Sequence, residues 1–173
     1  ITAIGTSSTL LAGTGTARPT LIGVLNVNTT AVGNVGAGVD DLMVYSMPAN
    51  TLSANGKGVR ITAWGTTAAG ANTETIGLQF GAGGITLFSS GLLFNGGSWR
   101  IVAEVIRTGA ATQESVCFGS VANQDSGVTT YRTTRATGTV SLTAVGDIKC
   151  TGTSSGSVTD EVVQRGMIVE MLN

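Results

Sequence analysis

Strict alternation of apolar and polar residues constrains this chain more than any other feature. In residues 58–65, Val59, Ile61 and Ala63 alternate with polar or aromatic residues, and an Asn-Gly turn signal precedes them. A period of two is the pattern of a half-buried strand, whose successive side chains point to opposite faces. Residues 75–80, 99–107 and 162–172 repeat this pattern, so they are predicted strands.

The predicted strands are short and are separated by glycine-rich turns. The chain holds 26 glycines among 173 residues, and only 11% of its residues are charged. About nine or ten strands with turn signals every 8 to 12 residues are typical of a sandwich or barrel. We predict an all-β fold, an antiparallel β-sandwich of jelly-roll type. The side chains expected inside are Val59, Ile61, Ile76, Leu78, Trp99, Ile101, Val105, Val140, Leu142 and Val169.

One domain is expected, with an appended arm. Residues 1–18 are small and polar and are predicted to form an extended N-terminal arm, ordered mainly by a neighbouring molecule; residues 19–173 form the sandwich. Further strands are expected at residues 20–27, 42–47, 85–88, 115–121 and 137–150, with loops at residues 29–39, 123–127 and 151–157.

The chain contains no histidine, which restricts its chemistry. Ser-His-Asp and Cys-His catalysis and the commonest zinc ligand are thereby excluded. Cys117 and Cys150 are the only cysteines. Two buried thiols are favoured over a single disulfide, which stays open.

The ten acidic residues are scattered along the sequence. Two of them could still meet across a cleft as in a glycosidase, but no pattern indicates it. Asp40 with Asp41 and Asp160 with Glu161 form the adjacent acid pairs. Calcium binding by such pairs is the alternative to solvated turn or strand-start residues, which we favour. We therefore predict no enzyme, no catalytic residue, no metal and no cofactor.

Charge and hydropathy favour self-association. The net charge is −1 and no basic patch is visible, so a nucleic-acid partner is not expected. The sequence contains no apolar run of about 18 residues, so no membrane span is predicted. Few charges and a mean hydropathy of +0.32 favour a homo-oligomer. Outward-facing Trp64, Val102 and Ile106 are the predicted interface, and Tyr131, in a polar loop, is the candidate ligand contact.

Several segments resemble small virion proteins of phages and prophages. They are residues 41–52 (DLMVYSMPANTL), 58–65 (GVRITAWG), 95–100 (NGGSWR) and 162–173 (VVQRGMIVEMLN). The resemblance extends from Leu42 to the C-terminus and transfers no site residue. It implies a β-sandwich, often trimeric, on the outside of a tailed-phage particle.

Two functions follow from the residues and the resemblance together. The leading hypothesis is a non-enzymatic structural component of a bacteriophage virion, exposed as a capsid decoration or fibre protein. It would form a homotrimer and contact other virion proteins, such as the major capsid or fibre proteins. The alternative is a carbohydrate- or receptor-binding module, such as a tail-fibre tip that binds a host-surface glycan.

Overall fold

The computed structural model describes residues 23–91, 96–123 and 129–172. These residues form eleven strands and no helix. The expected arm at residues 1–18 and its boundary lie outside the described residues. The strands are β1 (Val24–Asn28), β2 (Val32–Val35), β3 (Gly38–Met47), β4 (Gly58–Thr67), β5 (Glu74–Phe80), β6 (Ile85–Ser89), β7 (Gly97–Arg107), β8 (Thr112–Asn123), β9 (Thr129–Thr139), β10 (Gly146–Ser154) and β11 (Thr159–Met171).

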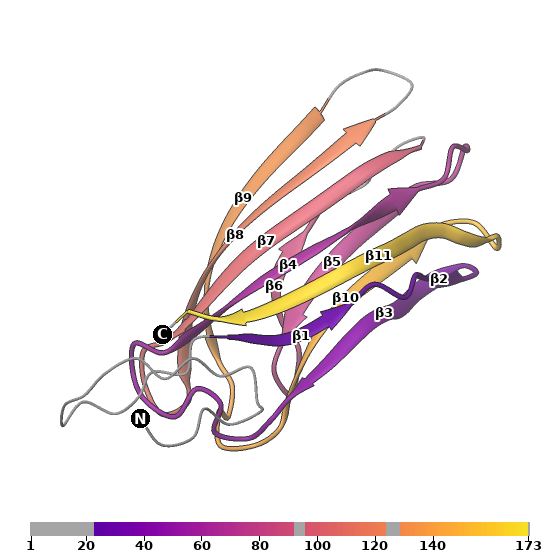
Figure 1. The fold of residues 1–173 in the computed structure, drawn as a ribbon. Helices are drawn as coiled ribbons and strands as arrows, with labels where there is room; N and C mark the ends of the chain where they lie inside the picture. The colour runs from indigo at the N-terminus through magenta and orange to yellow at the C-terminus, as the bar shows by residue number, and fades with distance from the viewer. Residues whose placement is uncertain (1–22, 92–95, 124–128, 173) are drawn as a thin grey trace, which may run out of the picture.

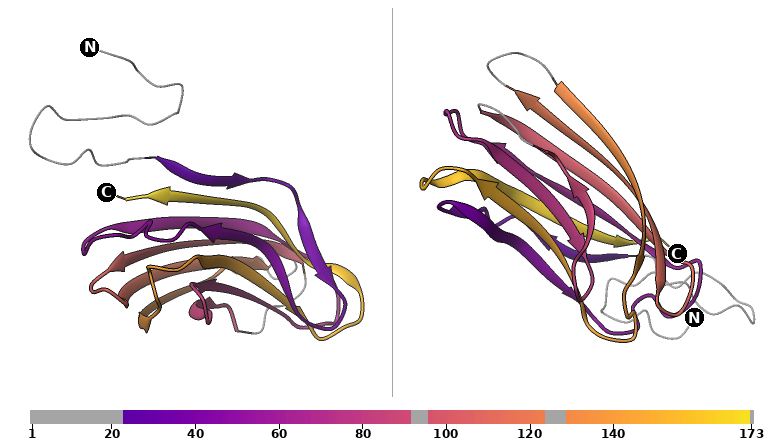
Figure 2. Two further views of the ribbon diagram at one scale, coloured as in Figure 1. Left: turned by 90° about the horizontal axis from the view of Figure 1, so that it is seen from below. Right: turned by 180° about the vertical axis from the view of Figure 1, so that it is seen from behind.

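Two antiparallel sheets pack face to face, as Figures 1 and 2 show. The seven-stranded sheet has the order β1-β11-β4-β7-β8-β9, with β2 also pairing with β11, and the four-stranded sheet has the order β3-β10-β5-β6. We count β1 and β2 as one interrupted strand and set the β8–β9 hairpin aside. Counted along the chain, the remaining eight strands have the order first, eighth, third, sixth in the large sheet. In the small sheet their order is second, seventh, fourth, fifth. This is jelly-roll order, so the predicted fold is confirmed.

The core lies between the two sheets and contains every side chain predicted to be inside. Small residues of the large sheet leave room for rings that cross this space. A Cβ added at Gly65 would lie 2.6 Å from the Trp99 ring, and one at Gly119 would lie 2.2 Å from the Phe88 ring. Because these glycines have no side chain, the aromatic rings can pack directly on the backbone.

Some segments differ from the prediction because their polarity hides their pairing. Residues 29–39 were expected to be a loop but contain β2 and the start of β3. The predicted strand at residues 137–150 is divided between the end of β9 and most of β10, which extends to Ser154 into the expected 151–157 loop. Backbone pairing with neighbouring strands decides these cases, and composition does not report it.

The two ends of the sandwich contain different parts of the chain (Figure 1). The described chain begins and ends at the same end, where the Met171 amide donates a 2.9 Å hydrogen bond to the Gly23 carbonyl. The β4–β5 and β10–β11 connections lie together at the opposite end. The Ser155 amide donates a 3.0 Å bond to the Thr73 carbonyl there and joins the two connections.

Candidate interaction surface

Apolar side chains gather on the outer face of the seven-stranded sheet, which points away from the core. The pairing register aligns Ile168, Thr62, Val102, Phe118 and Thr133 in one row across five strands. Side chains opposite one another on neighbouring strands lie close enough to touch. We call this set the apolar patch: Trp64, Val102, Ile106, Val116, Phe118, Tyr131 and Ile168.

All three predicted interface residues lie on this patch. Trp64, Val102 and Ile106 are each half-buried within the single chain and alternate with buried neighbours. Trp64 is half-buried because its indole lies over Gly166, where an added Cβ would come within 2.1 Å of the ring. The structure therefore brings the three side chains to one face, and whether a partner covers them remains a prediction.

Phe118 and Tyr131 form a stacked pair at the outer part of the patch. Their ring centroids are 5.8 Å apart with an interplanar angle of 28°. Phe118 is 45% exposed and Tyr131 66% exposed. The prediction of a loop at Tyr131 was wrong, because this residue lies in β9, paired with Ser120 of β8.

Sequence reasoning missed Val116, Phe118 and Ile168. In β8, small residues such as Cys117 and Gly119 point inward and the larger Val116 and Phe118 point outward. This inverts the usual rule, because Phe88 of the other sheet fills the space above Gly119. The alternation of large and small residues was the available signal, but it did not reveal which set faces the core.

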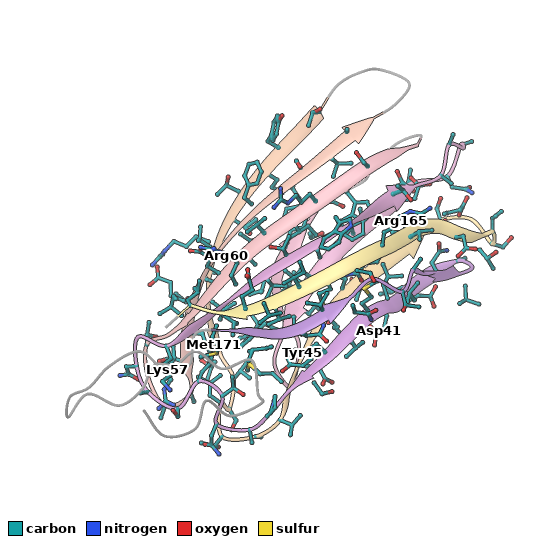
Figure 3. The ribbon with its side chains drawn as sticks, viewed as in Figure 1. Asp41, Tyr45, Lys57, Arg60, Arg165 and Met171 are labelled. Atoms are coloured by element: carbon teal, nitrogen blue, oxygen red, sulfur yellow. The ribbon has the colours of Figure 1, made fainter. Side chains whose placement is uncertain are left out.

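Paired charges flank the patch. Arg60 Nη2 of β4 lies 2.7 Å from Glu104 Oε1 of the neighbouring β7. Arg135 Nε lies 2.7 Å from Glu114 Oε1. Figure 3 shows Arg60 toward the chain-terminal end of the sheet, away from Arg165. Exposed pairs add little to stability, but they neutralise each other.

A shallow hollow of about 440 Å³ adjoins the patch between β7, β8 and β9. Ile106, Val116 and the paired Glu114 and Arg135 contribute to its lining. The hollow makes this part of the sheet surface uneven.

The outer face of the four-stranded sheet has the opposite character. Val44 of β3 and Gln79 of β5 flank Lys149 of β10, whose ammonium lies 2.9 Å from the Asp41 carboxylate. The Ser46 hydroxyl donates a 2.7 Å hydrogen bond to Asp147. The molecule thus presents one face with an apolar patch flanked by charged residues, and one largely polar face.

The adjacent acid pairs do not form one site. Asp41 pairs with Lys149, and Asp40 accepts a 2.9 Å hydrogen bond from the Val35 amide. Asp160 is exposed with a φ of 61°, but Glu161 is buried, so the expectation of a solvated residue there was wrong. Glu161 is buried because β11 turns its side chain inward between the sheets. No group of three or more acidic, histidine or cysteine side chains with metal-binding geometry occurs in the described ranges.

Both cysteines are buried free thiols, as favoured from the sequence. Burial raises the pKa of Cys117 and of Cys150 to about 12. The thiolate is the nucleophile, so neither residue is a plausible reactive group. The part of the chain that the structure describes also contains no helix long and apolar enough to cross a membrane.

No family model and no curated protein matches the sequence. Among solved structures, the chain is similar to the CBM2 module of the evolved Dit of Lactobacillus casei BL23 phage J-1. That likeness has 14% identity and a TM-score of 0.33, and it covers 73% of this chain and 67% of that chain. A second likeness, to infectious bursal disease virus Gx strain, has 12% identity and a TM-score of 0.34. It covers 100% of this chain but only 36% of that chain. At these values neither likeness carries functional information.

Proposed function

We propose that the chain is a non-enzymatic structural component of a bacteriophage virion, exposed on the particle as a capsid decoration or fibre protein. The resemblance to small phage virion proteins supports this role, and the jelly-roll order of the strands agrees with it. Jelly rolls are common in coat and lectin domains. The proposal rests on the apolar patch, because an exposed apolar surface is typical of a protein that binds other protein molecules.

The proposed occupant of the patch is a second copy of the same chain, most simply in a homotrimer. Monomers rarely expose large contiguous apolar patches, and closed symmetry is the usual way to cover them. The charged residues in the rows around the patch are three arginines and three glutamates: Arg60, Arg100, Arg135, Glu104, Glu114 and Glu170. Because their charges balance, two copies of this face would meet without net electrostatic repulsion. The choice of trimer over dimer rests on the resemblance.

Light scattering at micromolar concentration tests the assembly. We expect a mass near a multiple of 17.3 kDa for the native chain and a mass near 17.3 kDa for Val116→Arg. Val44→Arg is the matched control, because Val44 is 44% exposed on the polar face and Val116 is 47% exposed in the patch. A monomeric native chain, or an equal loss of mass in both variants, contradicts the proposal.

Placement on the particle needs a separate measurement. Mass spectrometry of purified intact particles should detect the chain, and antibodies raised against it should label their surface in electron micrographs. Absence of the chain from intact particles would contradict the virion role. Labelling only after disruption would contradict its outer-surface position.

The stacked Phe118 and Tyr131 favour a second candidate, binding of a host-surface glycan or receptor. Exposed aromatic rings give sugars an apolar surface on which to stack. A glycan array separates the two roles: specific hits that Tyr131→Ala abolishes indicate a binding tip. A purely structural protein gives no hits.

The absence of catalysis is also part of the proposal. The chain has no histidine, and the buried acids among the described residues are Glu74 and Glu161. Reducing-sugar release that Glu74→Gln abolishes would contradict it.

A further inference from the structure

Two carboxylates are buried at the end of the sandwich where β5 and β11 begin. Glu74 is 1% exposed and Glu161 is 5% exposed. Glu74 of β5 pairs with Ser154 of β10, and the Ser154 hydroxyl donates a hydrogen bond to Glu161, so the two carboxylates share one site. A buried charge is unfavourable unless a partner compensates it.

The described residues supply that compensation only in part. The Asn72 amide and the Ser154 hydroxyl each donate a hydrogen bond to Glu161, one to each carboxylate oxygen. Oxygen Oε2 of Glu74 is buried and has no hydrogen-bond partner. The three ion pairs in the described ranges use Asp41, Glu104 and Glu114 instead. The site thus holds more negative charge than its neighbours offset.

The donor set fits a hard cation. Glu74 and Glu161 provide four carboxylate oxygens and Ser154 a hydroxyl oxygen, and a half-turn of the Asn72 amide would add its carbonyl oxygen. Ca²⁺ takes six to eight oxygen ligands, and waters complete the set where protein groups do not. The Ser154 hydroxyl is also held in place, because the Gly156 amide donates a 3.0 Å hydrogen bond to Ser154 Oγ.

We infer that Glu74, Glu161, Ser154 and Asn72 bind one Ca²⁺ ion that ties the two sheets together. Glu74 and Ser154 belong to the four-stranded sheet and Glu161 to the seven-stranded sheet, so the ion joins both layers. Asn72, in the β4–β5 connection, is the partly exposed member and marks the side of entry. This inference is independent of the proposed function.

Thermal unfolding of chelator-treated protein, with CaCl₂ as the added probe, tests the site. At about 100 times the dissociation constant we expect Tm to rise by roughly 5 to 10 °C. Calorimetric titration should give one ion per chain. The rise should disappear in Glu161→Gln and in Glu74→Gln, and it should shrink in Asn72→Ala, which removes only a peripheral ligand.

Asp41→Asn is the control, because it removes an exposed acid from the polar face and should leave the calcium-induced rise intact. Circular dichroism confirms that each variant is folded, and the Asn72→Ala comparison remains informative if a glutamine variant does not fold. A native Tm that calcium leaves unchanged overturns the inference, and the pair then shares a proton instead. A rise that persists in folded Glu161→Gln overturns it as well.

Discussion

Both tryptophans of the chain face a glycine on the neighbouring strand. Trp64 of β4 pairs with Gly166 of β11 on the outer face, and Gly65 of β4 pairs with Trp99 of β7 on the inner face. A large ring that lies over a glycine covers backbone that would otherwise be exposed, which stabilises the pair. Gly65 of β4 therefore lets the Trp99 indole pack in the core, and the adjacent Trp64 places its own indole in the patch on the opposite face.

Replacing Gly65 with alanine should destabilise the fold. The new Cβ would lie 2.0 Å from the Val163 carbonyl oxygen as well as against Trp99, and the backbone cannot move aside without breaking strand pairing. We expect the free energy of unfolding to fall by about 1 to 3 kcal/mol, measured by urea denaturation. Gly23→Ala is the control, since nothing lies within 4 Å of its added Cβ. Equal stability of both variants would refute the packing argument.

At the scale of elements, the β8–β9 hairpin extends the large sheet beyond the eight jelly-roll strands and covers β6. Arg132 donates a 2.6 Å hydrogen bond to the Ser89 carbonyl, and the Thr134 hydroxyl donates one of 2.6 Å to the Leu87 carbonyl. These side chains bind β6 of the facing sheet, so the hairpin helps to close the sandwich at this edge.

Thr134→Val should weaken this attachment. The substitution keeps the shape of the side chain but removes the hydroxyl that satisfies the Leu87 carbonyl, so stability should fall by about 1 kcal/mol. Thr133→Val is the matched control, because Thr133 is exposed on the opposite face of β9. Urea denaturation of both variants checks the difference, and an equal effect would show that the inward hydrogen bond contributes nothing.

The same elements show how far sequence reasoning reaches. β4 and β7 were predicted because they lie in the middle of the sheet, where burial of one face imposes strict alternation. β9 was largely missed because its side chains are mostly threonine and arginine, and its strand form depends on pairing with β8. In the candidate site, Trp64 was placed correctly on the outer face by its alternation with Ala63. Glu161 was misplaced because its burial depends on hydrogen bonds with Asn72, 89 residues away in the sequence, and with Ser154 of the facing sheet.

At the scale of the whole molecule, the two thiols connect stability to pH. Cys117 belongs to β8 and Cys150 to β10, so one comes from each sheet. Each thiol has a pKa of about 12 in the folded chain against 9.0 for the unperturbed group. A domain of this kind commonly unfolds as one unit, so both shifts act on global stability.

The sign follows from the raised pKa. Below pH 9 both thiols are protonated in the folded and the unfolded chain, and their contribution is fully present. Between pH 9 and 12 the unfolded chain loses these protons first, so stability falls with rising pH. The slope approaches about 1.4 kcal/mol per pH unit for each thiol. Urea denaturation from pH 8 to 10.5 should show a steeper decline for the native chain than for the Cys117→Ala, Cys150→Ala double variant. Parallel declines would show that the thiols do not contribute.

The hydrogen bond from Met171 to Gly23 has a consequence for any attachment of this domain. Polypeptide joined at either boundary of the sandwich departs from a single pole. A scaffold linked there would hold the domain by one end, and the β4–β5 and β10–β11 connections would lie at the opposite, unattached end. A peptide inserted at residues 69–71 would consequently be displayed at the end of the sandwich opposite the scaffold.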